Sequence, residues 1–179
     1  MKFVVTLHGE TALNLESRLQ GHIDTPLHEI GIRNALHKRD ILKQNNPPIT
    51  RIVSSDLRRA VHTAQIINIV LSAPHDIDPR LRECGYGTLQ ELSKAELALA
   101  WAWGKWTRSF LQYDFRPMGG ECRDDVLKRH IDVFDDLKRK YAEDTILIVG
   151  HSKSMNTFLT AQGMLDLPLR RHEIKMIEY

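Results

Sequence analysis

Three short apolar runs along the chain predict buried β-strands. They occupy residues 3–7, 51–54 and 145–149, and each is followed at once by polar residues or glycine. Runs that stay apolar, without alternating polar positions, are typical of strands that are covered on both faces of a mostly parallel sheet. The pattern therefore predicts a sheet that lies inside the molecule.

Between these runs the apolar positions recur at helical spacing. Residues 57–71 and 126–141 each carry one apolar face, a further helix is expected to begin near Ser152, and a weaker one covers 28–43. In this weaker helix Gly31 costs about 1 kcal/mol relative to alanine. Strands that alternate with helices predict an α/β fold of three layers, with helices on both faces of a mostly parallel sheet.

The rest of the pattern predicts one domain with two functional loops. We find no internal repeat and no linker, so residues 1–179 are expected to form a single domain. Residues 11–26 and 80–90 are polar and rich in turn signals, which indicates loops. In open α/β sheets, ligands bind at loops that follow the carboxyl ends of the strands.

Composition limits the class of protein, its partners and its cellular compartment. The chain is 42% hydrophobic and 27% charged, as in a globular protein, and its net charge of +2 gives no support for a nucleic-acid partner. Its two cysteines, Cys84 and Cys122, form neither a disulfide framework nor a metal-binding spacing. No apolar run approaches the length of a membrane span. We therefore expect a cytoplasmic protein with no membrane partner, either a monomer or a homodimer.

Two histidines are the strongest candidates for chemistry. His8 and His151 each follow a predicted strand at a turn that contains glycine. A single histidine at a strand end is more often structural. Parallel strands, however, would bring both imidazoles to the same edge of the sheet, which favours a shared site.

Arg59 and Glu83 supply further groups that phosphoryl transfer requires. Arg59 lies at a predicted strand-to-helix junction, where helix starts attract anions and a guanidinium can bind two phosphate oxygens. Glu83 lies in a loop beside two glycines, where a carboxyl group could protonate a leaving alkoxide. Taken alone, Arg59 would more often be a solvated residue at a helix start, and Glu83 an exposed loop charge.

The order and spacing of these residues resemble the histidine phosphatase superfamily, which includes cofactor-dependent phosphoglycerate mutases and many small phosphatases. The resemblance covers nearly the whole chain. It is carried by His8-Gly9-Glu10-Thr11, Asn14, Gln20-Gly21, Asp24-Thr25-Pro26-Leu27, Gly31, Ser54-Ser55-Asp56-Leu57-Arg58-Arg59-Ala60, Thr63-Ala64, Leu81-Arg82-Glu83, Gly119-Gly120-Glu121 and Val149-Gly150-His151.

The resemblance implies a phosphoglycerate mutase-like fold and a role for each site residue. His8 would be the nucleophile that forms a phosphohistidine. Arg59 and His151 would bind the phosphoryl oxygens, and Glu83 would donate and then accept a proton. No metal and no cofactor are implied, because basic side chains supply the positive charge. The substrate-binding residues would be Thr11, Asn14, Gln20, Gly21 and Ser152.

At three positions the sequence departs from the family pattern. Leu7 stands where the family has arginine before the nucleophile, so we expect an apolar gap in the site and impaired catalysis unless another cation takes its place. Ser152 replaces a usual glycine. Glu91 also replaces a glycine, and its carboxylate would repel an anionic substrate if it pointed inward.

Three functions fit this pattern. A phosphatase would hydrolyse the phosphohistidine, a mutase would return the phosphoryl group to phosphoglycerate, and a pseudoenzyme would only bind a phosphorylated ligand. Mutases carry an arginine where this chain has Thr107 and a lysine near Ala100, and their cap is longer than the segment around 84–120. The sequence therefore favours a phosphatase that acts on a small phosphorylated metabolite.

Overall fold

A mixed sheet forms the centre of the molecule. The computed structural model describes residues 1–45, 48–102, 107–164 and 168–179. Within these residues the strands lie in the order β3-β2-β4-β1-β5; β5 runs antiparallel to β1, and the other pairings are parallel. The strands are β1 (Lys2–Leu7), β2 (Arg51–Ser54), β3 (His75–Ile77), β4 (Thr145–Gly150) and β5 (Ile174–Glu178). The predicted mostly parallel sheet is confirmed. Strand β3 was not predicted from the sequence because it is short and mostly exposed.

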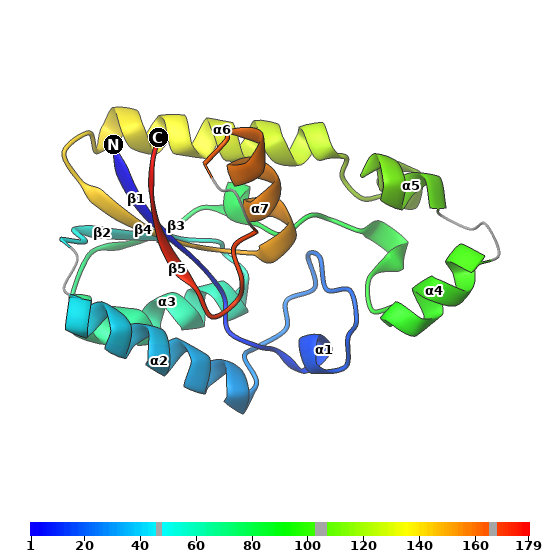
Figure 1. Cartoon of the computed structure of the whole chain (residues 1–179), viewed down its shortest axis with the longest axis horizontal. Coiled ribbons are helices and arrows are strands. Elements are labelled where there is room, and N and C mark those ends of the chain that lie inside the picture. Colours follow the sequence, from blue (N-terminus) through cyan, green and yellow to red (C-terminus); the bar gives the residue numbers. More distant parts are fainter. Residues whose placement is uncertain (46–47, 103–106, 165–167) are drawn as a thin grey trace.

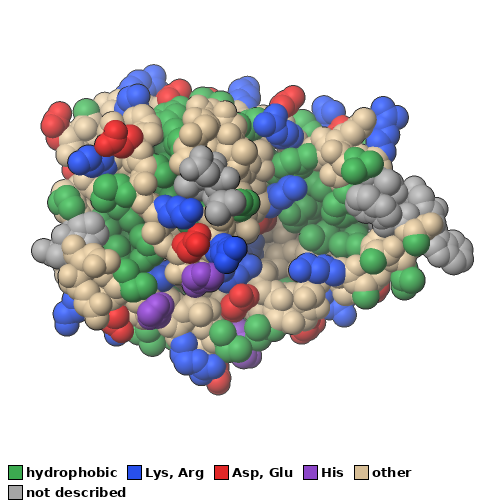
Figure 2. All heavy atoms as spheres, in the orientation of Figure 1, with side chains coloured by type: hydrophobic (Ala, Val, Ile, Leu, Met, Phe, Trp, Pro, Cys, Tyr) green, Lys and Arg blue, Asp and Glu red, His purple; other side chains and the backbone are tan. Residues whose placement is uncertain are grey.

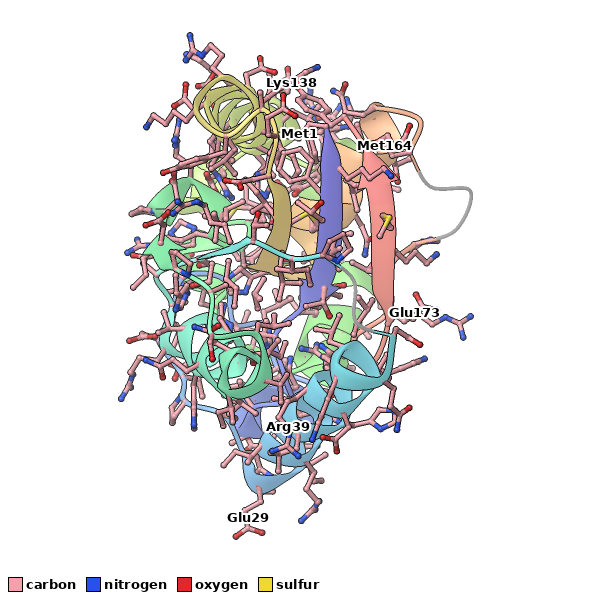
Figure 3. All side chains as sticks on the ribbon, turned by 90° about the vertical axis from the view of Figure 1, so that its left-hand side faces the viewer. Met1, Glu29, Arg39, Lys138, Met164 and Glu173 are labelled. Carbon is pink, nitrogen blue, oxygen red and sulfur yellow. The ribbon has the colours of Figure 1, made fainter. Side chains whose placement is uncertain are left out.

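Helices cover both faces of this sheet, as expected for three layers (Figures 1 and 3). The two on one face are α2 (Glu29–Asn45) and α3 (Arg58–Leu71), and the two on the other are α6 (Arg123–Lys140) and α7 (Ser152–Ala161). Strand β1 shows how the sequence builds the layers. Phe3 and Val5 pack toward α6 and α7, whereas Val4, between them, packs toward α2 and α3.

The two predicted loops contain short helical turns. In the first, α1 (Ala12–Leu15) begins at Thr11, whose hydroxyl accepts a hydrogen bond from the Asn14 amide. The second contains the 3₁₀ turns η1 (Pro79–Leu81) and η2 (Gly87–Leu89). The segment expected to form a cap extends away from the sheet (Figure 1). It carries α4 (Lys94–Ala102), α5 (Thr107–Gln112) and the 3₁₀ turn η3 (Arg116–Met118).

Gly31 has a packing role that its low helix propensity alone does not indicate. A Cβ atom at this position would lie only 2.0 Å from the backbone oxygen of Glu10, so no larger residue fits without movement of the main chain. The helix cost of glycine is therefore offset by the close approach of α2 to the loop after β1. That approach fixes the backbone that follows His8.

Charges of both signs are mixed over the face seen in Figure 2, where Lys and Arg side chains alternate with Asp and Glu. Among the described residues, no helix combines the length and hydrophobicity needed to cross a membrane.

Candidate phosphate-binding site

His8 and His151 lie side by side at one edge of the sheet. They follow β1 and β4, which pair in parallel with Leu7 opposite Gly150. The centroids of the two imidazole rings are 5.0 Å apart, and both side chains are almost completely buried. The expected proximity of the two histidines is confirmed, and one phosphate group could contact both.

The hydrogen bond from His8 to Gly9 decides which ring nitrogen carries the lone pair that can act as a nucleophile. Its Nδ1 lies 2.6 Å from the carbonyl oxygen of Gly9. A carbonyl only accepts, so Nδ1 carries the proton and Nε2 keeps its lone pair. Burial, followed by the charges of Arg171 and Arg59, holds the pKa of His8 well below its ordinary value. The imidazole is therefore neutral at physiological pH, as nucleophilic attack requires.

His151, beside His8, carries a donor without a partner. Its Nδ1 accepts a hydrogen bond of 3.3 Å from Nε of Arg59, so the proton lies on Nε2. This Nε2 is buried and has no hydrogen-bond partner among the described residues. Burial and then Arg59 lower the pKa of His151 as well. A buried donor without a partner is costly, and a phosphoryl oxygen beside His8 would satisfy it.

Arg59 is a completely buried cation, fixed at the start of α3. Its guanidinium donates to the carbonyl oxygens of Gly21 at 2.8 Å and Ile23 at 2.6 Å, in addition to His151. Burial lowers the pKa of Arg59 to about 10, against the attraction of Glu83 and Asp24, so the group stays charged at neutral pH. Gly21 has φ +56°, which glycine tolerates best, and so presents its carbonyl to Arg59.

Backbone amides hold the carboxylate of Glu83. Its Oε1 accepts hydrogen bonds from the N–H groups of Cys84 and Ser154, and its Oε2 accepts one from Lys153. Two of these donors belong to the first turn of α7, where the helix dipole favours negative charge. Each carboxylate oxygen has two lone pairs, so Oε2 keeps one that can carry a proton.

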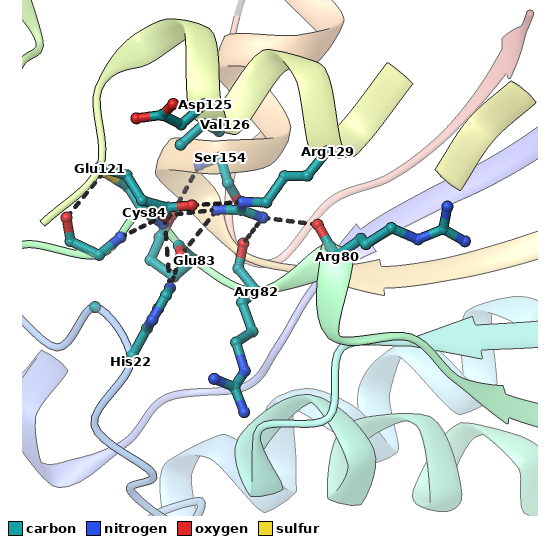
Figure 4. A network of polar contacts seen from close by, with 12 residues as sticks. His22, Arg80, Arg82, Glu83, Cys84, Glu121, Asp125, Val126, Arg129 and Ser154 are labelled. Carbon is teal, nitrogen blue, oxygen red and sulfur yellow. Dashed lines mark hydrogen bonds and ion pairs between the residues drawn. The ribbon is translucent and has the colours of Figure 1, made fainter. Parts of the chain in front are cut away.

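Arg129 fixes the backbone that carries Glu83, a role that sequence analysis missed (Figure 4). Its guanidinium donates to the carbonyl oxygens of Arg82 at 2.6 Å and Glu83 at 3.0 Å, and it pairs with Glu121. Although burial opposes it, hydrogen bonds from His22 and Arg129 lower the pKa of Glu121 to about 2. An arginine in the middle of a helix gives no signal in the sequence that it binds a distant loop.

A cavity of about 720 Å³ opens over His8 and carries more basic than acidic side chains. The acidic ones are Glu10 and Glu83. The basic ones are Arg18, Arg59, Lys94, Arg123, Lys153 and Arg171. Such a cavity attracts anions and is larger than inorganic phosphate needs.

Four of the five expected substrate-binding residues line this cavity: Asn14, Gln20, Gly21 and Ser152. The side-chain oxygen of Asn14 accepts from Thr11, which leaves its NH₂ group available to a ligand. The fifth, Thr11, is fully buried and caps α1, so it lies outside the cavity lining.

The expectation that Leu7 leaves an apolar gap is wrong, and the condition under which Glu91 would repel an anionic substrate is not met. Leu7 leaves no apolar gap in the cavity, because its side chain packs in the core cluster with Phe3 and Val5, on the face toward α6 and α7. Its carbonyl oxygen accepts a hydrogen bond from the buried Nζ of Lys38. Glu91 is exposed and lies outside the cavity lining, so it does not point inward.

Arg171 occupies the space beside the nucleophile, and sequence analysis did not single it out. Its Nη1 lies 3.3 Å from both ring nitrogens of His8, and its Nε lies 3.0 Å from Oε1 of Glu10. In the sequence it belongs to a basic run before the last strand, which resembles an ordinary solvated turn. In the described part of the chain no three His, Cys, Asp or Glu side chains are grouped as metal ligands.

Comparisons with known proteins point to one family. Residues 4–176 match the family model of the Histidine phosphatase superfamily (branch 1). A glucosyl-3-phosphoglycerate phosphatase of Mycolicibacterium vanbaalenii is 36% identical over 177 residues, which are 94% of this chain and 76% of that protein. A metal-independent phosphoserine phosphatase of Arabidopsis thaliana is 32% identical over 84% of this chain and 63% of its own length.

Solved structures show the same fold. The Bacillus stearothermophilus protein YhfR superposes with a TM-score of 0.85 at 27% identity, covering 99% of this chain and 90% of that one. A mycobacterial glucosyl-3-phosphoglycerate phosphatase in complex with VO3 gives 0.77 at 31% identity, covering 96% and 85%. A probable phosphoglycerate mutase of Yersinia pestis is 46% identical, but over only 46% of this chain and 38% of that protein.

Proposed function

This chain belongs to the histidine phosphatase superfamily, and from that premise we propose that it hydrolyses a phosphomonoester through a phosphohistidine on His8. One observation carries the proposal. The neutral imidazole of His8 carries its lone pair on Nε2, and its ring centroid lies 5.0 Å from that of His151, whose Nε2 donor has no partner among the described residues. This arrangement suits attack on a phosphorus atom and stabilisation of its oxygens.

In the first step, the Nε2 lone pair of His8 forms a bond to phosphorus as the ester P–O bond breaks. Arg59 and His151 donate to the phosphoryl oxygens, whose charge is the main electrostatic demand of the transfer. The leaving oxygen takes a proton. Of the two acidic side chains that line the cavity, Glu10 is paired with Arg171, which leaves Glu83 as the proton donor.

In the second step, water attacks the phosphohistidine. The carboxylate of Glu83 accepts a proton from the water, the P–N bond breaks, and its electron pair returns to Nε2 of His8. Inorganic phosphate is released, and both residues recover their starting protonation states. The same carboxyl group thus serves as acid and then as base.

We propose a substrate with a second anionic group, such as a phosphorylated sugar acid or amino acid. The cavity volume of about 720 Å³ exceeds that of a phosphate group, and Arg18, Lys94, Arg123 and Lys153 add positive charge beyond Arg59. Two relatives are named after their substrates, glucosyl-3-phosphoglycerate and phosphoserine. Both of these compounds contain a carboxylate besides the phosphate. The buried free thiols of Cys84 and Cys122 suit a reducing compartment, and we place the reaction in the cytoplasm.

Trapping the intermediate tests the proposal. The protein is mixed with p-nitrophenyl phosphate, quenched in alkali, which preserves phosphohistidine, and digested for mass spectrometry. We expect phosphate on His8 and no turnover by His8→Ala, whereas His62→Ala, which changes an exposed histidine, keeps the parent rate. Turnover by His8→Ala at the parent rate would refute the proposal. Efficient interconversion of 3- and 2-phosphoglycerate would instead favour a mutase.

A further inference from the structure

The residue before the nucleophile contributes no charge to the site. The Leu7 side chain is 1% exposed and packs in the core, and its carbonyl oxygen points to Lys38. Arginines that act on a transferring phosphoryl group are worth roughly 10³–10⁵ in rate. A working site of this kind therefore needs a cation from elsewhere in the chain.

The topology of β5 brings a distant segment to this place. β5 runs antiparallel to β1, with Ile174 opposite Thr6. The residues just before β5 therefore lie at the same edge as the end of β1, where His8 stands. Arg171 is three positions before Ile174, and its side chain lines the cavity.

The side chain of Arg171 is fixed in a position that suits phosphate binding. Its Nε is paired with Glu10 at 3.0 Å, and only 24% of the side chain is exposed. Its Nη1 lies 3.3 Å from Nε2 of His8. Any phosphoryl group attached to that nitrogen has its oxygens within reach of the guanidinium, whose planar set of donors matches them.

We infer that Arg171 is the phosphate-binding cation that replaces the arginine missing at position 7. It would contact the phosphoryl oxygens from beside His8, in addition to Arg59. The inference rests on the proposed function, because it assigns a residue to the same reaction. Lys38 is the other nearby cation, but it is fully buried, donates to the Leu7 carbonyl oxygen and does not line the cavity.

Glu10 has a matching role as a positioning residue. A partly buried guanidinium needs a fixed anion to hold its orientation when the substrate is absent, and Glu10 provides it from the loop after β1. In this arrangement one edge of the Arg171 guanidinium faces Glu10, and Nη1 faces the ring of His8.

Three variants separate this role from a general effect on the fold. Arg171→Ala removes the cation, Arg171→Lys keeps the charge without the planar fork, and Arg170→Ala changes an exposed neighbour as the matched control. With p-nitrophenyl phosphate we expect Arg171→Ala to lower kcat/KM by roughly 10³-fold, with Arg171→Lys intermediate and Arg170→Ala unchanged. Added guanidinium should restore part of the activity of Arg171→Ala, which a residue with a merely structural role would not show.

Binding of inorganic phosphate gives a readout that does not depend on turnover. By titration calorimetry, Arg171→Ala should bind phosphate about 10- to 100-fold more weakly than the parent and the Arg170→Ala control. If Arg171→Ala matches the parent in both binding and rate, the inference is wrong while the phosphatase proposal stands. If the parent binds phosphate through Arg171 but never forms phosphohistidine, the proposed function is wrong while the assignment of Arg171 stands.

Discussion

His130 should make the folded state sensitive to acid without any part in the reaction. It lies on α6, is fully buried, and donates from Nδ1 to the carbonyl oxygen of Val126 at 3.0 Å. Its Nε2 is buried with no partner in the described residues, so a proton there would have no acceptor. Burial, and next the charge of Arg129, lower the pKa of His130 to about 3.

The sign and size of the effect follow from linkage. The unfolded chain binds a proton at His130 below pH 6.5, whereas the folded chain stays neutral down to about pH 3. The stability from this residue is therefore present above pH 6.5 and is lost as the pH falls from 6.5 toward 3. At pH 5 the loss is about 2 kcal/mol relative to pH 7.5. Such a loss is large for a domain whose whole stability is about 5–15 kcal/mol.

Chemical denaturation of the parent and His130→Phe at several pH values tests this reasoning. Phenylalanine keeps an aromatic ring beside Phe158, whose ring centroid is 5.9 Å from that of His130, and it does not titrate. The difference in unfolding free energy between parent and variant should shift by about 2 kcal/mol toward the variant between pH 7.5 and 5. His62→Phe, at an exposed site, should show no such shift. Parallel curves for parent and His130→Phe would refute the argument.

Two further predictions concern the site. Glu83→Gln keeps one oxygen, which can still accept from the Cys84 and Ser154 amides, but it loses the acceptor for the Lys153 amide and cannot supply the proton. It should therefore slow alkyl phosphates by about 10²-fold or more and aryl phosphates far less; equal slowing would remove Glu83 from the acid role. Leu7→Arg should lower the melting temperature, since it places a charge in the core, and should change turnover by less than about threefold because Arg171 already lies beside His8. A gain of ~10³-fold would show that the parent site lacks a cation.

The layers of the fold could be predicted because buried positions in strands and helices are apolar at regular spacings in the sequence. Strands β1, β2 and β4 are mostly buried and appear as short runs centred on apolar residues, and the helices over them show one apolar face. Strand β3 could not be predicted, because its three residues are paired on only one side and mostly exposed. The turn of α1 was missed because four residues make too short a pattern, although Thr11 and Asn14 form its cap.

The centre of the site could be predicted because parallel strands place their ends together. Two parallel strands that are each followed directly by a histidine bring His8 and His151 together once the strands are recognised. The contacts that fix Glu83 are different in kind. Arg129 reaches its loop from a helix 46 positions further along the chain, and such a contact depends on tertiary packing that no local pattern records.

The proposed role of Arg171 meets the condition set for Leu7, that another cation take the place of the missing arginine. The absence of arginine at position 7 indicates impaired catalysis only if the cation must come from the adjacent residue. A phosphoryl group is sensitive to the position of a guanidinium in space and not to its place in the chain. An antiparallel strand beside β1 enters at the edge where β1 leaves, so the turn before β5 can supply the same charge from 163 residues away. Leu7 is then free to act as a core residue, and the test of activity moves to Arg171.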